Sequence, residues 1–242
     1  NGTSHSTIDI SGDAVLSNIG YLYVHSYNPA DADLSANIHD GGRLGFKQAR
    51  HKNTSARATV RLSVNGGTLA NDNKGAQKAT LQDWISSLGV ASVKVGPKGA
   101  TFTTDNGAKA GTAQIACAIT AEAAEAGETA KGLTFDRGCW EFTAAGNAYE
   151  GPTVIKNGAV LFLDANGTIP STSTVTVGSG SELCAGTVVI HTLCAGEHKP
   201  AAVQLQIPVY RKEDRPGIGA CQNTAFQIGI NMYNVVQRRI VR

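Results

Sequence analysis

Carboxylates and one histidine gather in a short segment near the N-terminus. The sequence NPADADLSANIHD, residues 28–40, places Asp31, Asp33 and Asp40 close to His39. Carboxylate oxygens are the ligands that Ca²⁺ prefers, and paired acids supply the proton transfers of polysaccharide cleavage. This segment is therefore a candidate Ca²⁺ site or catalytic pair. The alternative is that these side chains satisfy backbone groups at a turn, which is the usual role of polar turn residues.

A small basic cluster follows. The segment RHKNTS, residues 50–55, is flanked by Arg43 and Arg57, and it could meet an acidic glycan or form a solvated corner. Four further histidines share no metal-ligand spacing, and the chain has no G-x-S-x-G sequence: His25, His51, His191 and His198. We expect no catalytic, cofactor-binding or metal site.

The five cysteines follow no metal-binding pattern. They have no C-x-x-C spacing, which argues against a zinc or thioredoxin-like site. In a secreted chain up to two disulfides and one spare thiol would fit, and Cys184 and Cys194 are close enough in sequence to bridge neighbouring strands. The alternative is that the cysteines are small buried hydrophobic residues: Cys117, Cys139, Cys184, Cys194 and Cys221.

Three asparagines begin an N-x-S/T triplet. Asn1, Asn53 and Asn166 are possible glycosylation sites if the host has the machinery. We take them as indications of exposure.

Composition favours an exposed or secreted β protein. Of 242 residues only 17% are charged, and the formal net charge is +2. No basic or acidic run indicates a nucleic-acid partner, and no apolar run reaches the roughly 18 residues of a transmembrane helix. The chain begins without Met, as a mature chain does once its signal peptide is removed. A chain shortened at this point for another reason would begin in the same way. We expect an extracellular or cell-surface location.

One sequence pattern recurs along the chain: a turn that contains glycine, followed by a short strand of alternating apolar residues. We call this pattern the glycine phrase. It occurs in DGGRLGF (40–46), VNGGTLAN (64–71), RGCWEF (137–142) and KNGAVLFLDANG (156–167), among others. From Gly138 to Gly158 to Gly180 the spacing is 20 and then 22 residues. A period in the twenties is typical of a solenoid, whose units bury their apolar faces by stacking. Strand 160–163 has two apolar faces, and the pattern does not indicate which one is buried.

Two segments interrupt this phrase. Within residues 73–95, Leu81, Trp84, Ile85 and Leu88 have helical spacing, so a short helix or a longer loop is expected there. Residues 117–132 are rich in Ala and Glu and are equally ambiguous, although AQIACAIT before them is typical of a strand.

The glycine phrase ends near residue 196. We therefore divide the chain into solenoid repeats, 1–195, and a C-terminal unit, 196–242. Two alternating strands around Val203–Val209 and Phe226–Met232, joined by RKEDRPG, predict a hairpin. The hairpin could cap the solenoid edge or link to a neighbouring subunit. The candidate linking residues are Phe226, Ile228, Ile230 and Met232.

The repeats resemble a known family. GNAYEGPTVIKNGAVLFLDANG (146–167) is similar to the autotransporter-associated β-strand repeat, also called the passenger-associated transport repeat, of secreted bacterial proteins. The resemblance covers roughly residues 8–190. It implies a right-handed parallel β-helix exported to the bacterial cell surface for adhesion, display or matrix building, with no catalytic residues.

The leading functional hypothesis is a non-enzymatic extracellular structural protein. It would be a surface adhesin or the self-assembling subunit of an extracellular filament, because stacked strands end in unpaired edges that can associate. The alternative is a polysaccharide-binding or polysaccharide-degrading β-helix. The low aromatic content, 6%, argues against sugar stacking. Self-association is thus the expected partner mode, with glycans as possible partners.

Overall fold

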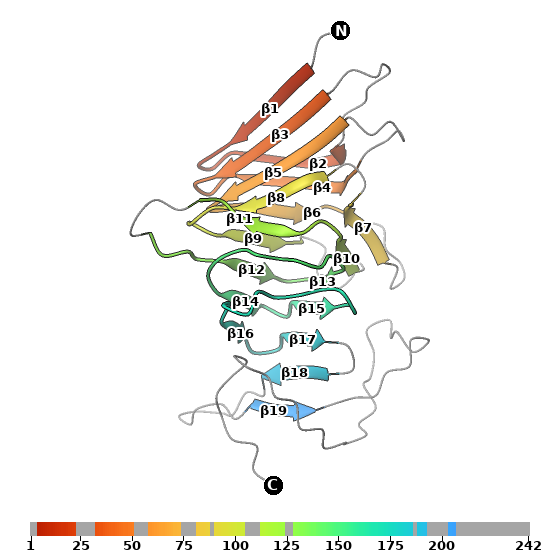
Figure 1. Ribbon diagram of the computed structural model, residues 1–242, viewed down its shortest axis with the longest axis vertical. Helices are drawn as coiled ribbons and strands as arrows, with labels where there is room; N and C mark the ends of the chain where they lie inside the picture. The colour runs from red at the N-terminus through yellow and green to blue at the C-terminus, as the bar shows by residue number, and fades with distance from the viewer. Residues whose placement is uncertain are drawn as a thin grey trace.

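All regular structure in the described part of the chain is β-strand. The computed structural model describes residues 4–22, 32–50, 58–73, 81–87, 90–104, 112–123, 128–185, 188–192 and 203–206. These ranges hold strands β1 to β19 and no helix, which confirms the all-β class for them (Figure 1). Accordingly, they contain no helical segment suited to crossing a membrane.

The strands form two sheets, and nearly all pairings are parallel. The smaller sheet stacks, in order, β1 (Ser4–Ile10), β3 (Ala32–His39), β5 (Ala58–Asn65), β8 (Val90–Val95) and β11 (Ile119–Ala121). One arm of the larger sheet runs from β4 (Arg43–Ala49) through β6 (Gly67–Asn71), β9 (Ala100–Thr103), β12 (Leu133–Asp136), β14 (Thr153–Lys156) and β16 (Val175–Val177). The other arm runs from β4 through β7 (Leu81–Ile85), β10 (Thr112–Ile115), β13 (Cys139–Phe142), β15 (Val160–Leu163) and β17 (Glu182–Ala185).

Strand β4 is the fork of the larger sheet. Its first half, Arg43–Phe46, pairs with β6, whereas Ala49 pairs with Ile85 of β7. Its opposite edge pairs with β2 (Val15–Leu22). Each pass of the chain therefore contributes two strands at the β1 end, three strands in the passes β5–β7, β8–β10 and β11–β13, and again two in β14–β15 and β16–β17. Figure 1 shows β1 and β2 at one end of the stack and β17 near the other.

In β3, β10 and β12, among others, alternate residues are buried in one continuous core. In β3 the buried positions are Ala32, Leu34, Ala36 and Ile38, as a pleated strand with one covered face requires. Parallel in-register pairing then stacks like positions above one another. One such column in the larger sheet is fully buried: Leu44, Leu69, Phe102, Phe135 and Ile155.

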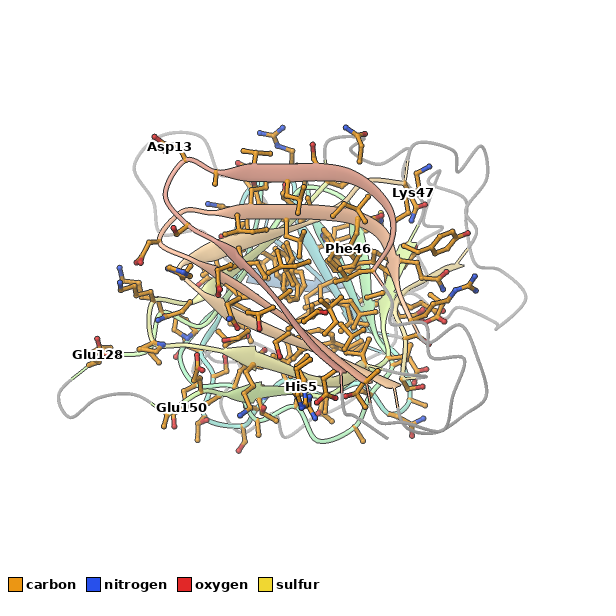
Figure 2. The ribbon with its side chains drawn as sticks, turned by 90° about the horizontal axis from the view of Figure 1, so that it is seen from above. His5, Asp13, Phe46, Lys47, Glu128 and Glu150 are labelled. Carbon is orange, nitrogen blue, oxygen red and sulfur yellow. The ribbon has the colours of Figure 1, made fainter. Side chains whose placement is uncertain are left out.

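Aromatic rings fill the centre of this core. Phe46 stacks on Trp84, with ring centroids 5.1 Å apart, and Trp84 meets Trp140 at 5.2 Å. Each indole N–H is satisfied by a backbone carbonyl, of Phe46 for Trp84 and of Arg137 for Trp140. Figure 2 shows Phe46 within the ring of strands. Burial of these rings stabilises the stack, because neither indole N–H is left without a hydrogen-bond partner.

Glycines of the glycine phrase lie at the bends between strands, as the sequence pattern predicts. Gly138, Gly158 and Gly180 have φ angles of 80°, 77° and 70° and lie between successive strands of the two arms. The Gly138 carbonyl accepts a hydrogen bond from the Val160 amide one pass later. The 20- and 22-residue spacings are thus the lengths of single passes through the stack.

Residues 147–149, with the sequence Asn-Ala-Tyr, take the place of a strand of the smaller sheet. Oδ1 of Asn147 accepts a hydrogen bond from the Ile119 amide, and Nδ2 donates to the Thr168 carbonyl. The Tyr149 hydroxyl is hydrogen-bonded to Thr153, which is bonded in turn to Ser173. These hydrogen bonds thus join three successive passes, because a buried amide can take over the hydrogen bonds of a missing strand.

One local expectation is wrong, and two that the sequence left open are settled by the structure. Residues 81–85 form a strand, and a bulge where β7 pairs with β10 lets the neighbouring Trp84 and Ile85 both be buried; the helical spacing was misleading. Residues 119–121, in the ambiguous alanine-rich segment, also form a strand. In β15 the core residue is Leu161, and Phe162 faces outward.

The C-terminal end of the described stack changes strand direction. β17 pairs antiparallel with β18 (Val188–Thr192), which pairs antiparallel with β19 (Val203–Gln206). The expected hairpin partner of 203–209 lies outside the described residues, as do the candidate linking residues Phe226, Ile228, Ile230 and Met232. The division at residue 195 stays a prediction.

Candidate binding surfaces

The predicted acidic cluster is dispersed. Asp33 lies near the start of β3 and Asp40 just beyond its end. Seven residues of extended strand separate them by roughly 23 Å, so they share no ligand. Asp31 lies outside the described residues. Within the described ranges no group of three His, Cys, Asp or Glu side chains is arranged to hold a metal ion.

Asp40 lies at the bend between β3 and β4. Its carboxylate accepts hydrogen bonds from Lys98 Nζ at 2.5 Å and from His39 Nδ1 at 3.0 Å. The Lys98 contact lowers the pKa of Asp40, and Asp40 raises the pKa of Lys98. Both side chains are about half exposed, and the pair joins the bend after β3 to the bend after β8, across the Gly66 bend that lies between them.

Asp33 has partners from the two neighbouring strands, β1 and β5. Thr59 Oγ1 donates to its Oδ1 at 2.5 Å, Arg61 Nη1 lies 2.9 Å from the same oxygen, and His5 Nδ1 lies 3.0 Å from Oδ2. The Thr59 hydrogen bond, with help from Arg61 and His5, holds the pKa of Asp33 below its ordinary value. We call these four residues the Asp33 cluster.

The Asp33 cluster lies on the outer face of the smaller sheet. The parallel register places His5, Asp33 and Thr59 directly opposite one another, and Arg61 is two positions along β5. His5 and Arg61 are 65% and 47% exposed, whereas Asp33 is 20% exposed. The cluster presents two outward donors around one engaged carboxylate, which suits hydrogen bonding to a hydroxylated or anionic ligand. Catalytic use of Asp33 would require breaking its contacts.

Sequence reasoning missed the Asp33 partners. His5 and Thr59 are 28 and 26 residues away in sequence, one pass of the stack on either side. A pass length near 27 residues in this part of the chain was the signal that could have found them. The spacing in the twenties was recognised only for the later repeats.

The first strands leave one end of the stack open. Among the described residues β2 pairs with β4 alone, and its opposite edge has no strand. Leu16 is 40% exposed, although its neighbours in the same inward column, Leu44 and Leu69, are fully buried. Val15 and Tyr21 are 62% and 53% exposed. We call this surface, formed by the free edge of β2 with Val15, Leu16 and Tyr21, the open end.

A bulge shapes the open end. Asn18 has a φ of 60°, and the β2–β4 register shifts between Leu16 and Ile19. The Asn18 amide donates to Oδ2 of Asp72 at 2.7 Å, and Asp72 is only 4% exposed. This hydrogen bond to the buried Asp72 carboxylate thus holds the backbone of the bulge in place.

The remaining predicted residues do not converge on one site. Arg43 lies in β4 and Arg50 directly after it, while 51–57 lie outside the described residues. Asn166 is exposed at a turn, whereas Asn1 and Asn53 are outside the described ranges. Glycosylation stays a prediction.

The described cysteines are buried. Cys117 and Cys139 are free thiols, and burial raises the pKa of both. Directly across from Cys184 lies Val189. Cys194 and Cys221 lie outside the described residues, so the Cys184–Cys194 bridge stays a prediction.

Comparison with known proteins does not identify the chain. No protein-family model, curated protein or solved structure matches it. The class that can be stated is an all-β protein built from long parallel sheets.

Proposed function

We propose that the chain is a right-handed parallel β-helix that serves as a non-enzymatic structural protein of an extracellular or cell-surface assembly. The handedness follows the general rule that parallel strands of one sheet are joined by right-handed crossovers in about 98% of cases. Along each sheet a strand pairs with the strand that follows it by two or three elements in the chain, and this repeated pairing supports a coiled arrangement. The resemblance to the autotransporter-associated β-strand repeat supports a surface role.

The open end carries the proposal of self-association. Leu16 stacks in register over a column of fully buried residues, yet it is 40% exposed. An uncovered apolar column beside an unpaired strand edge is the feature through which β proteins associate. The chain would therefore act as a self-assembling subunit, of a filament or of an adhesive surface layer.

Sedimentation of the purified chain at rising concentration, with electron microscopy of the same samples, tests this function. We expect assemblies that grow with concentration. Dispersed monomers throughout would contradict self-assembly.

The Asp33 cluster favours a second candidate, binding of an extracellular polysaccharide along the outer face of the smaller sheet. Arg61 and His5 would supply the outward donors. A panel of acidic and neutral polysaccharides, tested with the chain and with Arg61→Ala, separates this role from the first one. Binding that is unchanged in Arg61→Ala would exclude the cluster.

A further inference from the structure

The open end has the charge pattern of a self-complementary edge. Strand β2, with the sequence VLSNIGYL, contains no charged residue. Asp13 is exposed at the turn before its first residue, and Figure 2 shows it at the periphery of the stack. Arg50 lies at the opposite end of the strand. An uncharged edge of eight residues, about 25 Å long, thus has an acid at one end and a base at the other.

Arg50 is held in this place by two contacts. Its amide donates to the Leu22 carbonyl at 3.2 Å, and its guanidinium lies 4.8 Å from the centroid of the Tyr21 ring. The positive charge is therefore fixed beside the last residues of β2. It extends the apolar surface of Tyr21 rather than interrupting it.

Geometry selects one mode of pairing between two copies. A two-fold axis brings the same edge of both copies together and makes the paired strands antiparallel. Asp13 of each copy then lies beside Arg50 of the other, and Leu16 lies near the partner's Tyr21. In a parallel pairing of the two edges the like charges would meet.

At the far end of the described stack the two arms end differently, since β16 pairs with β14 alone among the described strands and leaves a parallel edge. There the arm that contains β15 and β17 continues into antiparallel β18 and β19. A head-to-tail contact on this arm would have to follow strands of a different direction and pairing. Strand β2 contains neither a lysine nor a proline, two residues that commonly protect a strand edge, and the bulge at Asn18 is the one edge-protecting feature within it.

We propose that a second copy of this chain covers the open end, with the two β2 strands paired antiparallel about a two-fold axis and Asp13 of each copy paired with Arg50 of the other. The inference rests on the proposed self-association and specifies its first contact. A two-fold contact is closed, so growth into a filament needs another contact elsewhere on the molecule.

Charge reversal tests the pairing. The chain, Asp13→Lys, Arg50→Glu and the double variant are compared by sedimentation equilibrium. Each single reversal should raise the dimer dissociation constant roughly tenfold, because two exposed ion pairs become like-charge pairs. The double variant should restore association, since it exchanges the two signs. A double variant as weak as the single ones would overturn the pairing.

A second pair of variants tests the edge itself. Leu16→Lys places a charge in the uncovered column and should weaken the dimer by roughly a hundredfold or more. Thr176→Lys, at an exposed position of β16 near the opposite end, is the matched control and should leave the dimer unchanged. Circular dichroism of all variants checks folding.

Two results separate the inference from the function on which it rests. Monomers at every concentration would overturn both the pairing and the self-association. Assemblies that form but respond to neither Leu16→Lys nor the charge reversals would overturn the pairing, and self-association through another surface would stand.

Discussion

Replacing Gly132 by alanine should destabilise the stack far more than the same change at Gly180. Both glycines have a positive φ, 67° and 70°. A Cβ at Gly180 would meet no atom within 4 Å, whereas one at Gly132 would lie 1.9 Å from the Pro152 carbonyl oxygen. That oxygen accepts the hydrogen bond of the Leu133 amide. The corner at Gly132 therefore has no space for a side chain.

The magnitudes follow from these contacts. A left-handed backbone costs a non-glycine residue about 1–2 kcal/mol, which both variants share. At Gly132 the clash adds about 1–3 kcal/mol, and a weakened hydrogen bond adds about 1 kcal/mol. We expect a loss of about 3–6 kcal/mol for Gly132→Ala and about 1–2 kcal/mol for Gly180→Ala. The larger loss is a substantial part of the 5–15 kcal/mol that typically stabilises a domain.

Urea unfolding followed by circular dichroism near the β-sheet minimum measures both variants, and the free energy of unfolding is extrapolated to water. Failure of Gly132→Ala to fold would agree with the prediction if Gly180→Ala folds normally. Equal losses in the two variants would refute the reasoning, because close contact between successive corners would then contribute nothing.

Three further outcomes are expected. Tyr149→Phe should lower the free energy of unfolding by about 1 kcal/mol, because it removes a buried hydroxyl from its hydrogen bond; urea unfolding against the parent checks this, and no loss would show that the bond is dispensable. Because the folded pKa of Asp33 is lowered, its stabilising contribution is present above the ordinary pKa of 3.8 and is lost as pH falls through the folded value. Asp33→Asn should therefore flatten the fall of stability in acid, measured by urea unfolding at several pH values, and an unchanged acid limb would contradict the assignment. Cys117, Cys139 and Cys184 should resist alkylation at mild alkaline pH until the chain is unfolded, because all three are buried; peptide mass mapping of native and unfolded samples would detect rapid native labelling, which would disprove their burial.

Local patterns were sufficient to predict the strand class and the corners. Alternation of small apolar and polar residues in Ala32–His39 identifies a pleated strand with one covered face. The left-handed glycines 138, 158 and 180 mark where each pass turns, because few other residues adopt that conformation without strain. Both signals are properties of neighbouring residues, so they are visible in the sequence.

Contacts between passes were decided by the tertiary structure. The helical spacing of Trp84 and Ile85 gave a wrong prediction, since a bulge beside β10 lets adjacent residues share the core. Leu161 rather than Phe162 is buried because of the register with β13, which a single strand does not reveal. The Asp33 cluster joins residues that lie one full pass apart.

The sequence by itself determined that the chain would form short strands with glycine corners, because backbone conformation and alternation are local. Only the tertiary structure decided which side chains became neighbours, since the parallel register pairs residues 20 to 36 positions apart. It also decided where the stack is left uncovered. Leu16 and Leu44 have the same residue type and occupy the same column, but only Leu44 has strands on both sides, so one residue is a surface and the other is core.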